Sequence, residues 1–412
     1  MQPAPESFPQ QVRRVMGDVR SAVGAVLREL PGDPSRPHEV QKALKLDRKL
    51  GWKVSRLVSD ADPFAATRFM LAPQALRIFL TAARRKGASD DQIQDVERAA
   101  RSFDDMIARH AGDRSSFDML IAGLTPEDRA AADLLHKRLA FQGMSYLLGL
   151  QARAHIVALF LNVNPEDNRR VDCVTLSGFV GLRRLREGVP FIVTRLRTVD
   201  DDGVDRARAR LEPLDPAVDA SQGVAVLPEF CAPSDLRLIS RAAPGGFTNV
   251  ELEPAGLGDT AAQTLFVSSV WRGAVSRYRD AHNDTGHSHA TVRTPTQTLI
   301  MDIVAHRDAF GPIVARSEVY SDVDVGTVLP PTARPLDRLP LTEAAVSLGS
   351  GAHALRCPEA PDYERAGQYV FARMGWSADE FEAHRVRVEF PLAPSSVLLS
   401  FGLPSAPVDM PR

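Results

Sequence analysis

Hydrophobic residues are spaced differently in the two halves of this chain. From residue 6 to about residue 162, apolar positions recur every three or four residues, as in Phe8, Val12, Val15 and Val19. That spacing places them on one face of an α-helix. After residue 164, short β-prone runs alternate with clusters of proline and glycine. We therefore expect an α+β protein, with an all-helical domain at 1–163 and a β-rich, mostly antiparallel domain at 164–412.

Start and stop signals divide the helical half. Pro31-Gly32-Asp33-Pro34 ends a helix over 6–30, and Ser89-x-x-Gln92 is a capping box for a helix that runs to about His110. Thr125-Pro126 starts the longest expected helix, because no proline interrupts 126–161. The wide apolar face of that helix is typical of a dimer seam or of a central core helix.

The β-rich half contains short candidate elements separated by turn residues. The expected strands are 191–197, 208–212, 223–227, 237–239, 264–270, 298–304, 313–319, 386–390 and 397–401. The expected helices are 270–280, 363–374 and 377–384, the last after the capping box Ser377-x-x-Glu380.

Positive charge is concentrated in one short segment. Residues 36–58 contain seven Lys or Arg residues and two acidic ones, Glu39 and Asp47, although the whole chain has a net charge of −2. The pattern predicts a short helix, a tight turn and a second helix capped by Asp47. In the second helix one face is apolar, and another face is cationic with one aromatic residue. The apolar face carries Leu50, Val54, Leu57 and Val58, and the cationic face carries Lys49, Trp52, Lys53 and Arg56.

Segment 37–58 resembles the helix-turn-helix of bacterial transcription regulators. The matching residues are Val40, Ala43, Leu44, Leu46, Asp47, Val54, Ser55, Arg56 and Leu57. Two positions depart from the pattern: Lys45 stands where the turn usually has glycine, and Gly51 stands where the second helix usually has a β-branched core residue. A glycine there also allows close packing against a neighbouring helix.

The resemblance implies a DNA-binding transcription regulator. Its basic helix, 48–58, would enter the major groove of double-stranded DNA. The implied DNA-binding residues are Lys45, Arg48, Lys49, Trp52, Lys53 and Arg56. Such proteins usually act as homodimers, and the C-terminal domain would then sense a small-molecule effector or mediate assembly. An ordinary helical hairpin with a solvated basic face, or another anionic partner, remains an alternative.

Histidines cluster once in the β-rich half. His282, His287 and His289 have a spacing that could hold a metal ion, which would make the protein a metal-dependent hydrolase. The intervening Asn, Asp, Thr, Gly and Ser residues favour a solvated turn instead. His306 and Asp308 follow an expected strand and are typical of a hydrogen-bonded turn. We therefore predict no catalytic residue, metal or cofactor and favour a non-enzyme, with a structural assembly protein as a further alternative.

Bulk composition narrows the remaining classes. A hydrophobic content of 44% with 25% charged residues is ordinary for a soluble globular protein. No apolar run is long enough to span a bilayer, and the N-terminus lacks the apolar core of a signal peptide. We therefore expect a cytoplasmic protein without a membrane partner. Its three cysteines, Cys173, Cys231 and Cys357, form neither a disulfide framework nor a metal-binding pair by spacing.

Overall fold

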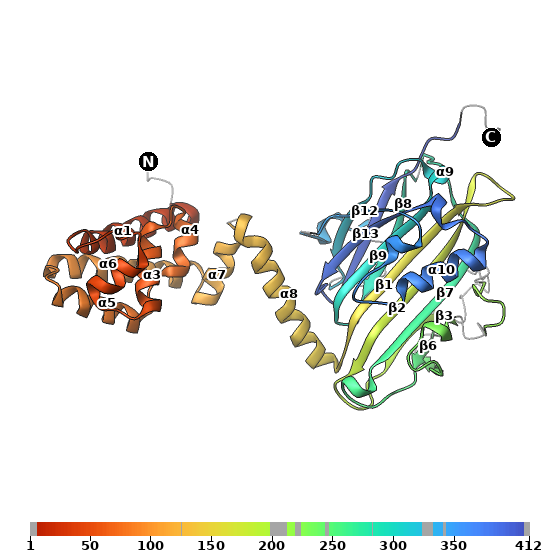
Figure 1. Ribbon diagram of the computed structural model, residues 1–412, viewed down its shortest axis with the longest axis horizontal. Coiled ribbons are helices and arrows are strands. Elements are labelled where there is room, and N and C mark those ends of the chain that lie inside the picture. Colours follow the sequence, from red (N-terminus) through yellow and green to blue (C-terminus); the bar gives the residue numbers. More distant parts are fainter. Residues whose placement is uncertain are drawn as a thin grey trace. The chain divides into compact units, whose positions relative to one another are not determined.

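The chain forms two compact units, Met1–Asp133 and Leu134–Arg412. The computed structural model describes residues 6–124, 126–197, 212–218, 224–243, 247–281, 283–323, 333–340 and 343–407 (Figure 1). The predicted α+β class is confirmed, because the first unit is helical and the second combines helices with mixed and antiparallel sheets. The all-helical part ends before the predicted boundary at residue 163, since a strand begins at Leu150.

Local signals account for the helices of the first unit. These are α1 (Phe8–Arg28), α2 (Pro37–Leu44), α3 (Arg48–Ser59), α4 (Pro63–Ala66), α5 (Pro73–Arg85), α6 (Asp90–His110) and α7 (Arg114–Ala122), with a 3-10 turn at Thr67–Phe69. The predicted capping box of α6 is present: Gln92 N donates to Ser89 Oγ, and Ser89 N donates to Gln92 Oε1. Apolar faces of these helices meet in one core that includes Val12, Met16 and Phe103.

The long helix α8 (Pro126–Leu148) is shorter than the predicted 126–161. It stops at Gly149, whose φ of 70° starts the turn into the first strand. One face of α8 is held by buried Phe141, whose ring lies 5.3 Å from that of Phe390, and by Lys137, whose Nζ lies 2.9 Å from a Glu343 carboxylate oxygen. Among the described residues, no helix is both long and apolar enough to cross a membrane.

The second unit is built on three sheets. A seven-stranded sheet has the order β12-β13-β9-β1-β2-β7-β4, a four-stranded sheet β11-β10-β14-β8, and a three-stranded sheet β3-β6-β5. The strands are β1 (Leu150–Val163), β2 (Arg170–Arg184), β3 (Phe191–Arg197), β4 (Ala225–Val226), β5 (Leu238–Ala243), β6 (Phe247–Leu252), β7 (Gln263–Ser276), β8 (Thr285–Val292), β9 (Thr296–His306), β10 (Arg316–Ser321), β11 (Arg338–Leu339), β12 (Val346–Ser350), β13 (Phe381–Glu389) and β14 (Ser395–Gly402). Among the strand pairs that the structure describes, only β1 and β9 run parallel.

The seven-stranded sheet is covered on both faces. On one face, Ile156 and Phe160 of β1 share a core with Tyr363 and Phe371 of α10 (Tyr363–Met374). Figure 1 shows α10 lying across the long strands. On the other face, residues such as Met301 of β9 pack against the four-stranded sheet. Burial on both faces explains the apolar runs 156–161 of β1 and 299–305 of β9, the second interrupted only by Asp302.

Most predicted strands are found, and two predicted helices are wrong. The strand 191–197 and the helix 363–374 are confirmed as β3 and α10, and six further predicted strands overlap β5, β7, β9, β10, β13 and β14. The described part of 223–227 holds β4, and 208–212 lies outside the described residues except Glu212, which bridges to Val270. Of the predicted helix 270–280, residues 270–276 are the end of β7 and 277–280 are not helical. The predicted helix 377–384 is a single 3-10 turn (Ala378–Glu380) followed by β13.

A buried polar triad joins α10 to the sheet. Arg385 of β13 lies directly opposite Asp302 of β9 and donates two hydrogen bonds to its carboxylate, at 2.8 and 2.7 Å. The hydroxyl of Tyr363 donates to the same carboxylate at 2.7 Å. Since both charges are paired and hydrogen-bonded, burial is tolerated, and the triad fixes helix and strands in one register.

Candidate nucleic-acid interface

The turn between α2 and α3 has a left-handed residue at the position where the sequence departs from the helix-turn-helix pattern. Lys45 has φ 54° and ψ 44°, and Leu46 N donates to Gln41 O at 3.1 Å to close the turn. Asp47 then caps α3 as predicted, because its Oδ1 accepts from Lys49 N at 2.9 Å and Leu50 N at 3.0 Å. The lysine therefore adopts the backbone conformation that glycine adopts at lower cost.

Gly51 sets how closely the two helices approach. A Cβ at this position would lie 2.9 Å from Gln41 Cβ and 3.1 Å from Gln41 Cα. The first distance is shorter than real Cβ contacts and the second is tight, so a side chain here would push α2 and α3 apart. A β-branched residue is thus absent here because α2 and α3 pack too closely for its side chain.

Most of the predicted DNA-binding residues are open to solvent. Lys45, Arg48, Lys49 and Arg56 are exposed, whereas Leu50, Val54 and Leu57 are buried, as the periodicity predicts. Within the described part of the chain, none of these basic residues, nor Lys53, forms an ion pair with a carboxylate. Other arginines of the same unit do so: Arg36 pairs with Asp33 and Glu39, and Arg84 pairs with Asp90.

Trp52 and Lys53 are partly covered. The Trp52 side chain is 46% exposed, and its ring meets Phe69 edge-on with centroids 5.3 Å apart. Lys53 is half-buried, and burial lowers the pKa of its ammonium group, with a further contribution from Arg114. Lys53 is therefore partly packed against its neighbours, whereas the Lys49 side chain is exposed.

Two hollows adjoin the α2–α3 turn. One, of about 1020 Å³, lies along α2 and α3 and is lined by His38, Gln41, Arg48, Lys49, Trp52 and Lys53 together with Pro37. The other, of about 660 Å³, lies between the turn and α5; its charged lining residues are Lys45, Arg77, Arg85 and Lys86. Neither lining includes a carboxylate. We call the exposed cations of α3, the turn and α5 the basic face; they are Lys45, Arg48, Lys49, Arg56, Arg77, Arg85 and Lys86.

Three members of the basic face were not predicted as partner contacts. In the sequence, Arg85 and Lys86 indicate only the cationic C-terminal end of a helix, and Arg77 lies mid-helix among apolar residues. The tertiary structure places all three in the same hollow as Lys45. The local charge of the sequence does not reveal these three residues, because α3 and α4 lie between the turn and α5 along the chain.

The histidine cluster is not a turn where the structure describes it. His287 and His289 lie on β8, opposite Ser400 and Leu398 of β14, and alternate with inward Ser288 and Ala290. The solvated-turn interpretation is therefore wrong for 285–289, and the two histidines share the outer face of the strand. His282 lies outside the described residues, and among those described no group of three or more His, Cys, Asp or Glu side chains could hold a metal ion.

His306 forms the predicted hydrogen-bonded turn. Its Nδ1 accepts from Asp308 N at 3.2 Å and so caps the short helix α9 (Arg307–Phe310). Its Nε2 lies 3.6 Å from a Glu380 carboxylate oxygen. These contacts give the ring a structural role.

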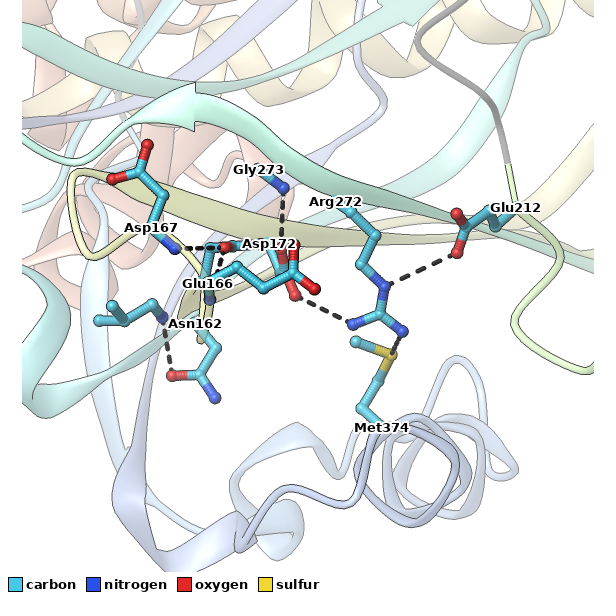
Figure 2. Close-up of polar contacts among 10 residues, drawn as sticks. Asn162, Glu166, Asp167, Asp172, Glu212, Arg272, Gly273 and Met374 are labelled. Carbon is cyan, nitrogen blue, oxygen red and sulfur yellow. Dashed lines mark hydrogen bonds and ion pairs between the residues drawn. The ribbon is translucent and has the colours of Figure 1, made fainter.

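A second polar cluster, around Asp172, also has a structural role (Figure 2). Asp172 Oδ1 accepts from Asn164 Nδ2 at 2.6 Å and from Gly273 N at 2.8 Å, and Oδ2 accepts from Arg272 Nη1 at 2.9 Å. Arg272 Nε also lies 3.6 Å from Glu212. With both oxygens engaged, this carboxylate holds the β1–β2 turn against β7.

No known protein family matches the chain, and no curated protein or solved structure is significantly similar to it.

Proposed function

We propose that this chain is a cytoplasmic, DNA-binding transcription regulator. The observation that supports the proposal is the basic face: six of its seven exposed cations line two hollows whose linings contain no carboxylate. Double-stranded DNA presents a regular array of phosphates, and binding releases condensed counterions. Under this proposal α3 enters the major groove, where Trp52 lies among Lys49, Lys53 and Arg56, and α5 contacts the backbone alongside.

A homodimer is part of the proposal. One recognition helix reads only a few base pairs, so regulators of this kind bind two half-sites about 34 Å apart. The face of α8 opposite Phe141 leaves Leu135, Leu139 and Tyr146 exposed, with Tyr146 76% exposed. A second copy of this helix is the occupant we propose for that face. The second unit then serves sensing or assembly.

Duplex binding and its salt dependence test the proposal. With four or five phosphate contacts per monomer, the logarithm of the binding constant should fall with the logarithm of salt concentration with a slope of about −4 per monomer. Fluorescence anisotropy with a labelled duplex measures this slope. Purified protein that shows no duplex binding at about 50 mM salt would rule the proposal out.

Paired charge reversals locate the surface. Lys49→Glu with Lys53→Glu should abolish binding, and Arg48→Glu with Lys49→Glu should do the same while replacing only exposed residues. The matched control is Arg98→Glu with Arg101→Glu on α6, where both arginines are exposed and the charge change is equal. If the control weakens binding as much as the α3 variants, the DNA surface is not the basic face.

A further inference from the structure

A cavity of about 280 Å³ lies between the seven-stranded and four-stranded sheets. Most of its wall is apolar, with Leu159 and Leu161 from β1, Trp271 from β7, Phe310 from α9 and Phe401 from β14. The polar residues of the lining are few: Thr175, Ser276, Asn283, Thr285 and His287, the last with its side chain on the outer face of β8. A mostly apolar hollow with a few polar groups is the usual form of a small-molecule site.

Trp271, one of the lining residues, carries a hydrogen-bond donor that has no partner. The indole Nε1 of Trp271 is buried and meets no acceptor among the described residues. An indole nitrogen can only donate, and a buried N–H that lacks an acceptor costs free energy. A ligand whose acceptor reaches this nitrogen therefore recovers the hydrogen bond.

The surrounding strands hold Trp271 in place. The β2–β7 ladder shifts register between Val171 and Cys173, so that Cys173 lies opposite Trp271, and the Asp172 carboxylate binds the adjacent Arg272 and Gly273 (Figure 2). Burial, with the nearby Asp172 charge, raises the pKa of the Cys173 thiol to about 12. That thiol stays protonated and acts as an apolar part of the wall.

The facing wall is fixed by a glycine. Gly286 of β8 lies opposite Phe401 of β14, and a Cβ on Gly286 would come within 2.5 Å of the Phe401 ring. The ring occupies the space that a side chain would take, and it meets Phe310 edge-on at 4.9 Å. Both walls are therefore formed before any ligand enters.

We propose that this cavity binds a small, largely apolar molecule with one hydrogen-bond acceptor, which receives the Trp271 Nε1 proton. The volume lies just below the range of drug-sized sites, so the ligand is small. The site stands independently of DNA binding, because all its residues belong to the second unit.

Two probes of nearly equal shape test the proposal. Acetophenone carries a carbonyl acceptor, and ethylbenzene lacks one. Titration of the full chain followed by ligand-observed NMR should show saturable binding of both, with acetophenone about five-fold tighter, a ratio that corresponds to about 1 kcal/mol. Thr175→Trp should fill the cavity and weaken both probes at least ten-fold. Absence of saturable binding to the wild type, or undiminished binding to Thr175→Trp, would overturn the proposal.

A conservative substitution tests the donor itself. Trp271→Phe keeps an aromatic ring and removes the N–H, so the two probes should then bind equally. Trp376→Phe is the matched control, because Trp376 stacks on Phe381 in the core below α10 and does not line the cavity. The five-fold preference should persist in that variant, and its persistence in Trp271→Phe would exclude Trp271 as the donor.

The indole signals give a readout that does not depend on variant stability. The chain has three tryptophans, so its ¹⁵N spectrum contains three indole N–H signals, assigned by single substitution to phenylalanine. Acetophenone should shift the Trp271 signal downfield, and ethylbenzene should not. Equal shifts with both probes would contradict a hydrogen bond at this nitrogen.

Discussion

At the scale of single residues, two departures from the helix-turn-helix pattern have opposite structural costs. Gly51 is required by the close approach of Gln41, whereas Lys45 occupies a left-handed conformation that is unfavourable for any side chain. Sequence comparison alone treats both as mismatches. In the structure, a side chain at position 51 would clash with Gln41, whereas a glycine at position 45 would remove backbone strain.

The first prediction concerns Gly51. Gly51→Ala gains up to about 1 kcal/mol of helix propensity but forces α2 and α3 apart, and overpacking of this kind costs about 1–3 kcal/mol. We expect a net fall in the free energy of unfolding. Gly17→Ala in α1 is the control: no atom lies within 4 Å of its added Cβ, so it should stabilise the unit. Urea melts of both variants decide the matter, and equal stabilisation would contradict the close contact.

The second prediction concerns Lys45. Lys45→Gly relieves the left-handed strain and should stabilise the first unit by about 1 kcal/mol. Because it also removes one cation of the basic face, it should reduce the slope of the salt dependence by about 0.9. Thermal melts and anisotropy on one preparation measure both effects. A stabilised variant with an unchanged slope would remove Lys45 from the DNA contacts.

The third prediction concerns pH and His155. This residue of β1 is buried and stacks on Phe179 at 4.0 Å, and burial lowers its pKa to about 4 from 6.5. The unfolded chain takes up the proton below pH 6.5, but the folded chain does not, so stability is lost as pH falls from 6.5 towards 4. At pH 4.5 the loss is about 2.5 kcal/mol relative to pH 7. The His155→Gln variant should not show this loss of stability at low pH, whereas His136→Gln, at an exposed position, should show it in full. If the stability of the two variants depended on pH in the same way, His155 would not be the group responsible.

At the scale of elements, local signals were sufficient where one face of an element meets solvent. Proline starts, Asp47 and the Ser89 capping box define the helices of the first unit, and 363–374 was correct for the same reason. The failures lie where a strand is buried on both faces. In 150–163, apolar and polar residues alternate only as far as Ile156, and apolar residues occupy both faces of β1 over 156–161. Ala154, Val157 and Leu161 therefore also fit the spacing of a helix.

Short-range signals also misled at the ends of the second unit's strands. The helix expected after Ser377 is a single 3-10 turn, and the Ser377 side chain makes no capping hydrogen bond. The residues that follow pair with β9 instead. Likewise 270–276 continues β7, whose pairing with β2 outweighs local preference. The α5 cations and the cavity at Trp271 were beyond prediction for the same reason: both depend on contacts between distant segments.

The fourth prediction concerns α5. If Arg77 and Arg85 contact phosphates, Arg77→Gln with Arg85→Gln should reduce the salt slope by about 2 and weaken all duplexes alike, since phosphate contacts carry no sequence information. A variant of α3 such as Trp52→Ala should instead change preference among duplexes. If the α5 variant lost its preference among duplexes, then α5, and not α3, would contact the bases.

The fifth prediction concerns α8. Leu139→Glu places a charge on the face proposed for a second copy and should convert a dimer to a monomer at micromolar concentration, as measured by light scattering. Leu336→Glu is the control, because that leucine is 98% exposed outside α8. A wild-type chain that is already monomeric would contradict both the seam and binding to a two-fold operator.

At the scale of the whole molecule, the two units have separate cores, so each should respond to its own variants. Calorimetry should resolve two transitions. Gly51→Ala should move one of them, and His155→Gln at pH 4.5 should move the other. A single transition displaced by both variants would show that the units unfold together.

The parallel pairing of β1 with β9 has a consequence for synthesis on the ribosome. The first unit is complete once its own residues emerge, since its core involves no later segment. Strand β1 must wait for β9, and β9 for β13, near the end of the chain. Until then an apolar strand edge stays open to pairing with other chains. A chain that ended before residue 381 would therefore have a folded first unit joined to an aggregation-prone, incomplete second unit.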